Sequence, residues 1–83
     1  MIRTFRQSVT FPHPFAISGL EGDQPAGTYT IETDEELIEG LSFSAYRRTA
    51  TRIYLPPGPA RPGTTEIVPI EPSEIELALK ERR

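Results

Sequence analysis

The chain contains no cysteine and only one histidine among its 83 residues. Without cysteine it forms no disulfide and presents no thiolate, so a zinc site would have to be built from carboxylates and His13. His13 lies between two prolines with no serine motif nearby, and we interpret it as an exposed linker residue. The fold is therefore expected to rest on packing alone.

Long apolar runs are also missing. No segment approaches the roughly 18 consecutive apolar residues of a membrane helix, and residues 1–10 lack the apolar run of a signal peptide. The sequence therefore predicts a cytoplasmic protein that does not enter a membrane. A chain of this length forms one domain, here 1–83, which buries only about 60 to 65% of its unfolded surface.

The common catalytic motifs are absent from the sequence. It has no Gly-x-Ser-x-Gly, no Walker loop and no Gly-x-Gly-x-x-Gly, which acyl transfer, phosphoryl transfer and dinucleotide chemistry respectively use. Paired carboxylates are present, but so small a domain hardly encloses the cleft that a glycosidase needs. We therefore expect neither an enzyme nor a cofactor.

Two stretches alternate apolar and polar side chains with the two-residue period of a half-buried strand. In the first, Phe5 and Val9 share a face with polar residues between them. In the second, residues 28–32, Tyr29 and Ile31 share a face in a composition rich in β-branched and aromatic residues. Each stretch is predicted to be a strand.

The segment Asp34–Gly40 has two interpretations. Thr33 followed three residues later by Glu36 fits a capping box, apolar residues follow at helical spacing, and Gly40 is placed to end a short helix. This pattern favours one helical turn. The alternative continues the preceding strand through Glu36 and turns at Glu39 and Gly40.

Residues 44–55 contain no glycine or proline and are predicted to form a strand, but which of its faces is buried stays open. Regular alternation places Tyr46, Arg48, Arg52 and Tyr54 together on one face. Interleaved aromatic and cationic side chains are typical of surfaces that stack bases and contact phosphates. Single-stranded nucleic-acid binding through these four residues is therefore the alternative functional hypothesis.

Charge is distributed unevenly along the chain. Residues 21–40 hold seven of the 12 acidic side chains and no basic one, whereas the next strand holds three arginines. The expected pairing of the two segments sets Arg48 opposite Glu32 or Asp34. The acidic run lacks the spacing and glycine of a calcium loop, so we predict no metal site there. The overall net charge of −3 makes nucleic acid an unlikely partner.

Beyond residue 55, a proline-rich loop is predicted over 56–63 and a short closing strand over 64–70. Ser73 followed by Glu76 fits a second capping box, which predicts a carboxyl-terminal helix through Ile75, Ala78 and Leu79.

One combination of segments resembles a known group of proteins. Pro14-Phe15, the sequence Pro-Ala-Gly-Thr-Tyr-Thr-Ile-Glu at 25–32, Asp-Glu-Glu-Leu at 34–37 and the stretch from Ser42-Phe43 to Tyr46-Arg47-Arg48 are similar to small alphaproteobacterial proteins that have no assigned activity. The likeness covers most of residues 11–55. It implies a bacterial cytoplasmic setting and transfers no catalytic residue.

Together these patterns predict a small α+β domain that is mainly β, with an antiparallel sheet curled into an open barrel or half-barrel and a helix packed across it. We expect a non-enzymatic interaction or structural protein that binds an unknown protein partner or forms a homodimer through an edge strand. Only Pro12 and Pro14 offer edge protection. The predicted core comprises Phe5, Val9, Phe11, Phe15, Ile17, Tyr29, Ile31, Leu37, Leu41, Phe43, Ile53, Leu55, Ile67, Ile75 and Leu79.

Overall fold

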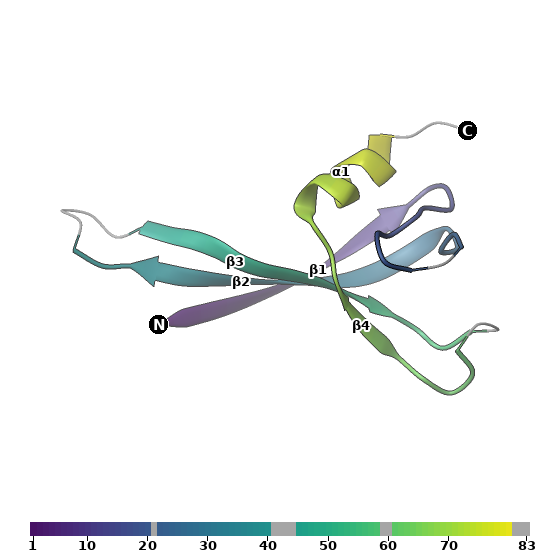
Figure 1. Cartoon of the computed structure of the whole chain (residues 1–83), viewed down its shortest axis with the longest axis horizontal. Helices are drawn as coiled ribbons and strands as arrows, with labels where there is room; N and C mark the ends of the chain where they lie inside the picture. Colours follow the sequence, from purple (N-terminus) through teal and green to yellow (C-terminus); the bar gives the residue numbers. More distant parts are fainter. Residues whose placement is uncertain (21, 41–44, 59–60, 81–83) are drawn as a thin grey trace.

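The computed structural model describes residues 1–20, 22–40, 45–58 and 61–80. Four strands form one antiparallel sheet in chain order, and a helix follows them (Figure 1). The elements are β1 (Ile2–Phe11), β2 (Gly27–Ile38), β3 (Ala45–Leu55), β4 (Glu66–Pro69) and α1 (Pro72–Lys80). The predicted class, a mainly β sheet with a carboxyl-terminal helix, is confirmed. The sheet is somewhat curled and does not close, because β1 and β4 lie at opposite edges.

The two amino-terminal strands pair without interruption from Ile2 opposite Glu36 to Phe11 opposite Gly27. Their side chains alternate as the sequence predicts. The face that carries Phe11 and Ile31 also packs against α1, and we call it the helix side. The opposite face, which carries Glu32, is the open side.

The helical interpretation of Asp34–Gly40 is wrong. β2 continues through Ile38, and Gly40 then adopts a positive φ of 84°. Residues 34–36 have partners on β1 and on β3, so their backbone groups join ladders on both sides. A single helical turn would have to fix several residues for very few hydrogen bonds, so pairing in the sheet outweighs the local capping signal.

The pairing of β2 with β3 differs from the expected register. Glu32 lies opposite Arg52, and Arg48 lies opposite Glu35 rather than Glu32 or Asp34. The register shifts between Asp34 and Glu35, which leaves Thr49 as an extra residue on β3. This β-bulge interrupts the regular alternation along β3.

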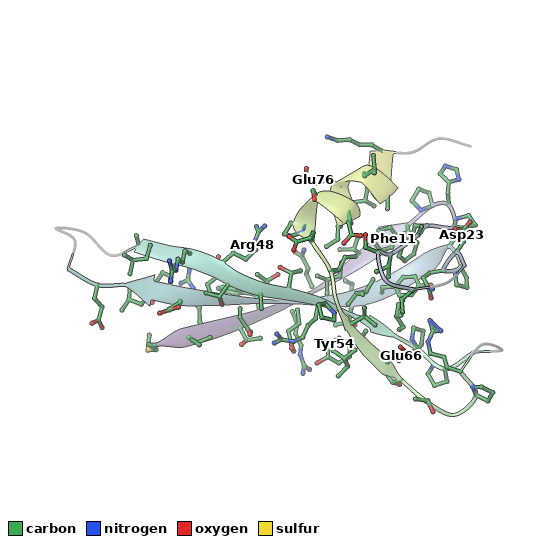
Figure 2. The ribbon with its side chains drawn as sticks, viewed as in Figure 1. Phe11, Asp23, Arg48, Tyr54, Glu66 and Glu76 are labelled. Atoms are coloured by element: carbon green, nitrogen blue, oxygen red, sulfur yellow. The ribbon has the colours of Figure 1, made fainter. Side chains whose placement is uncertain are left out.

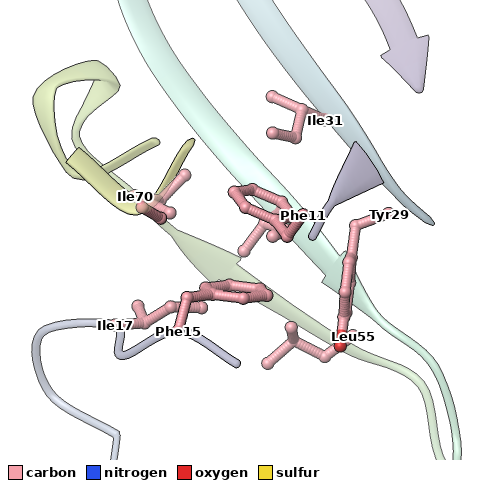
Figure 3. Packing of buried hydrophobic residues seen from close by; sticks show 9 residues of the cluster. Phe11, Phe15, Ile17, Tyr29, Ile31, Leu55 and Ile70 are labelled. Atoms are coloured by element: carbon pink, nitrogen blue, oxygen red, sulfur yellow. The ribbon is translucent and has the colours of Figure 1, made fainter. Parts of the chain in front are cut away.

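The core gathers at one end of the sheet, beneath α1 (Figure 3). Phe11 and Phe15 stack with ring centroids 4.0 Å apart, and the Tyr29 ring meets both edge-on. Phe15 exchanges two backbone hydrogen bonds with Gln24, which brings the loop after β1 back onto the sheet. The buried apolar side chains are Phe11, Phe15, Ile17, Tyr29, Ile31, Ile53, Leu55, Ile70 and Ala78.

The predicted core is confirmed beneath α1, and it is wrong for three side chains that are exposed. Val9 and Ile75 pack against the core while partly buried, and Leu37 is half-buried. Phe5, Ile67 and Leu79 are exposed, because nothing in the described chain covers their positions. The core residues Ile70 and Ala78 were not predicted, and the expected positions Leu41 and Phe43 lie outside the described residues.

The helix begins one residue before its predicted cap, Ser73. Pro72 is its first residue, and the side chain of Glu74 accepts a hydrogen bond from the Glu71 backbone N–H at 3.0 Å. The other Glu74 oxygen accepts from the Ser18 N–H at 2.9 Å. Glu74 therefore caps the helix, the role that the sequence pattern assigned to Ser73 and Glu76, and it also ties the helix to the loop after β1.

Away from the core, the sheet continues as an arm that α1 does not reach (Figure 1). We define the arm as residues 2–6 of β1, 33–38 of β2 and 45–50 of β3. It accounts for much of the length of a molecule that measures 50 × 30 × 21 Å along its principal axes. The arm makes β1 accessible over most of its length.

Candidate interaction surface

The outer edge of β1 presents a row of backbone polar groups that the sheet does not use. The Leu37 N–H donates to the Met1 carbonyl at 3.0 Å, so residues 1 and 37 form a hydrogen-bonded pair. In an antiparallel ladder such pairs alternate, so the odd-numbered residues of β1 bond to β2. The even-numbered residues direct their N–H and C=O groups outward. We call this row the β1 edge; its residues are Ile2, Thr4, Arg6, Ser8 and Thr10.

Few of the usual devices that protect a sheet edge are found on β1. The strand has ten residues, contains no proline, glycine or lysine, and pairs with β2 without a bulge. The opposite edge differs, because β4 has four residues and ends at Pro69. The exposed part of β3 carries the bulge at Thr49. Among the described strands, β1 is thus the long, regular and open edge.

Apolar side chains accompany these free backbone groups. Met1, Ile2 and Phe5 are 77%, 61% and 49% exposed. Met1, Phe5 and Val9 project on the helix side of the sheet, beyond or at the margin of the core. A strand that added to the β1 edge would cover apolar surface while it completed the ladder.

On the open side, charged residues from three strands form one cluster. The Glu32 carboxylate accepts hydrogen bonds from Arg6 Nε and Arg52 Nε, both at 2.6 Å. Arg52 also donates to both oxygens of Asp34, at 2.9 and 3.0 Å. The Thr4 hydroxyl donates to Asp34 at 2.7 Å. The cluster joins β1, β2 and β3 across the open side.

These contacts change the pKa values of the cluster. Hydrogen bonds from Arg6 and Arg52 lower the pKa of Glu32, and hydrogen bonds from Arg52 and Thr4 lower that of Asp34. The same partners raise the pKa of Arg6 and of Arg52. All four groups are charged at neutral pH, and each cation is already paired with an anion.

The helix side of the arm has a separate contact between a cation and aromatic rings. The Arg3 guanidinium lies 3.5 Å from the ring centroid of Tyr46 and 4.9 Å from that of Phe5. Arg3 also forms an ion pair with Glu35 at 2.8 Å. Tyr46 is thus covered by a side chain of β1.

The four residues of the nucleic-acid hypothesis do not lie on one face of β3, so the expected shared face is wrong. The bulge at Thr49 sets Tyr46 and Arg48 on the helix side, while Arg52 and Tyr54 lie on the open side. Figure 2 shows Arg48 and Tyr54 directed away from each other across the sheet. Arg52 is bound by two carboxylates, and the Tyr54 hydroxyl donates to Glu32 at 3.3 Å.

A shallow cleft lies where the start of α1 approaches the middle of β3. Arg48, Thr51 and Glu74 contribute to its walls, together with Ser18 from the loop after β1. The hydroxyl of Thr51 is buried and has no hydrogen-bond partner among the described residues. The Glu74 carboxylate accepts hydrogen bonds from the backbone N–H groups of Ser18 and Glu71.

Two other kinds of site are absent from the described ranges. No group of three histidine, cysteine, aspartate or glutamate side chains in them is arranged to hold a metal ion. Within the same ranges, no helix has the length and apolar character needed to cross a membrane.

Sequence reasoning foresaw an open edge but did not identify β1 as that edge. The available signal was the absence of proline and glycine from residues 2–11. The charged cluster was missed because it depends on register, which pairs Arg6 with Glu32 and Glu32 with Arg52.

Comparison with protein-family models, with curated proteins and with solved structures finds no match to this chain. The resemblance to small alphaproteobacterial proteins stays a prediction.

Proposed function

We propose that this chain is a non-enzymatic interaction module that binds an extended protein segment as an additional strand on β1. The observation that carries the proposal is the β1 edge, a ten-residue strand with outward backbone groups and no bulge. Strand addition of this kind obtains affinity from main-chain hydrogen bonds and selectivity from alternate side chains. The setting we propose is the bacterial cytoplasm.

Several features support an interaction role. The exposed side chains of Met1, Ile2 and Phe5 give an incoming strand apolar contacts beside the ladder. Arg3 and Arg6 are paired with Glu35 and Glu32, so they repel a basic segment less than two unpaired arginines would. These apolar contacts and paired charges suit an extended polypeptide as the ligand.

Nucleic-acid binding is not proposed as a second function. The separation of Tyr46 and Arg48 from Arg52 and Tyr54 leaves no face on which the four residues act together.

The proposal is tested by removing one outward donor from β1. Ser8 is exposed and directs its N–H away from β2, so Ser8→Pro deletes that donor and places the ring where an added strand would lie. Ser8→Ala keeps the N–H and is the matched control. Circular dichroism and thermal unfolding would verify that both variants keep the fold.

Binding is measured by sedimentation velocity for self-association and by capture on immobilised protein for other partners. We expect the wild type and Ser8→Ala to bind alike, and Ser8→Pro to lose at least about tenfold in affinity, the equivalent of one or more ladder bonds. A wild type that stays monomeric at millimolar concentration and retains no protein beyond those retained by Ser8→Pro would contradict the proposal.

A further inference from the structure

We infer that the strand added at the β1 edge is β1 of a second copy of this chain, antiparallel and centred with Phe5 of one copy opposite Phe5 of the other. The inference rests on the proposed function, for which it names the partner. Antiparallel pairing of identical strands about a two-fold axis gives an isologous contact, the commonest arrangement in homodimers.

The apolar pattern of β1 is symmetric about Phe5. Met1, Phe5 and Val9 follow one another at intervals of four residues on the helix side of the sheet. In the inferred register, Met1 of each copy lies opposite Val9 of the other. The polar residues between them also match, because Arg3 lies opposite Gln7. On the helix side, each apolar side chain therefore meets an apolar one, and each polar side chain meets a polar one.

Neighbouring registers lack this match. The outward groups belong to even-numbered residues, so the pairing can shift only in steps that keep even residues opposite even ones. One such shift sets Phe5 against Gln7 and Arg3 against Val9. The shift in the other direction sets Phe5 against Arg3 and Met1 against Gln7.

Charge on the open side favours the same register. Arg6 of one copy lies opposite Thr4 of the other, and the Thr4 hydroxyl is bonded to Asp34. Arg6 thereby comes to lie between its own Glu32 and the Asp34 of the second copy. The shift that sets Phe5 against Gln7 would instead place the two Arg6 side chains directly opposite each other, where like charges repel.

The arrangement also gives the arm a neighbour. Because the strands are antiparallel, the arm of each copy lies beside the part of the second copy that contains the core. Met1 of one copy lies next to Val9 of the other, at the margin of that core. Both helices lie on the same side of one continuous sheet. The length of β1 beyond the reach of α1 is thus used by the contact.

The absence of cysteine from the chain allows a direct test of register. Phe5 is half-exposed and outside the core, so Phe5→Cys adds a single thiol without opening a cavity. In the inferred dimer residue 5 forms a pair that is not hydrogen-bonded, with Cα atoms about 4.5 Å apart, within the range that a disulfide spans. Gln7→Cys is the control, because its equivalents in the two copies lie several residues apart.

Under mild oxidation we expect Phe5→Cys to form a covalent dimer at least about tenfold faster than Gln7→Cys. A mixture of Arg3→Cys and Gln7→Cys chains should link to each other in preference to themselves. The wild type offers an independent readout, since the amide hydrogens of Thr4, Arg6 and Ser8 should gain protection from exchange as concentration rises.

The outcomes separate the two levels of the proposal. Faster linkage of Gln7→Cys than of Phe5→Cys would overturn the register. No linkage of any variant, with a monomeric wild type and no concentration-dependent protection of these amides, would overturn the second copy as the partner. In that case, a protein that is captured by the wild type but not by Ser8→Pro would still support strand addition by another partner. A protein captured equally by the wild type and Ser8→Pro would count against the second copy and against strand addition at β1.

Discussion

Arg52 lies directly opposite Glu32 in the sheet, yet its guanidinium also donates two hydrogen bonds to the Asp34 carboxylate, two residues further along β2. One side chain thereby holds two consecutive acids on the same face of the strand. The planar fork of arginine matches a carboxylate in a way that a lysine ammonium does not. The register of β2 and β3 is thus fixed by geometry as well as by charge.

Replacement of Arg52 should therefore destabilise the sheet more than replacement of an exposed arginine. We expect Arg52→Lys to lower the urea midpoint of unfolding, and Arg52→Ala to lower it further, because both leave Asp34 without its two-point contact. Arg47→Ala is the matched control, since Arg47 pairs with Glu36 at a more exposed site. Equal effects of the alanine variants at positions 47 and 52 would show that the cluster adds nothing beyond a surface ion pair.

Stability should fall as the solution is acidified. Folding lowers the pKa of Glu32 and of Asp34 below their ordinary values of 4.5 and 3.8. The unfolded chain then binds more protons, so the stabilisation is fully present above these ordinary values and is lost as pH falls through the folded pKa values. Urea unfolding measured from pH 7 to pH 2 should show this decline, and it should be shallower in Glu32→Gln. An unchanged slope in that variant would assign the acid sensitivity to other carboxylates.

Two phenylalanines on the same face of β1 should respond differently to truncation. Phe11 is 1% exposed and stacks on Phe15, so Phe11→Ala should reduce the free energy of unfolding by about 3 to 5 kcal/mol. Phe5 is 49% exposed, so Phe5→Ala should change the stability of the monomer by no more than about 0.5 kcal/mol. Chemical unfolding at low protein concentration tests both values, and similar losses would mean that the arm has a core of its own.

Substitution of two glutamates on α1 distinguishes the cap seen in the structure from the cap predicted by the sequence pattern. Glu74 accepts hydrogen bonds from the backbone of Glu71 and Ser18, so Glu74→Ala should cost about 1 kcal/mol of unfolding free energy. Glu76 is exposed and should tolerate the same change with little effect. A larger loss at Glu76 would favour the cap that the sequence pattern suggests over the one in the structure.

The parts of the fold that were predictable from sequence are those set by local alternation. Tyr29 and Ile31 lie two residues apart, so they share one face of a strand, and both are buried. Phe5 has the same parity as Phe11 but stays exposed, since α1 does not extend over the arm (Figure 1). Alternation shows which residues share a face and does not show how far the covering element extends.

The arrangement of the candidate surface depended on contacts between distant segments. The bulge at Thr49 follows from how β3 meets β2, and no residue type near it signals the extra position. Ile70 is buried because its N–H donates to the Thr51 carbonyl and draws the chain toward the sheet. Register and chain path of this kind arise from pairing of the whole sheet, which a single segment does not encode.

The extra residue at position 49 gives β3 a tolerance for change in length. If Thr49 were deleted, Ala50 would keep Asp34 as its partner and Arg48 would keep Glu35. The strand would straighten locally, and Tyr46 would remain beneath Arg3. The same cross-strand neighbours of β2 and β3 are therefore compatible with a β3 that is one residue shorter.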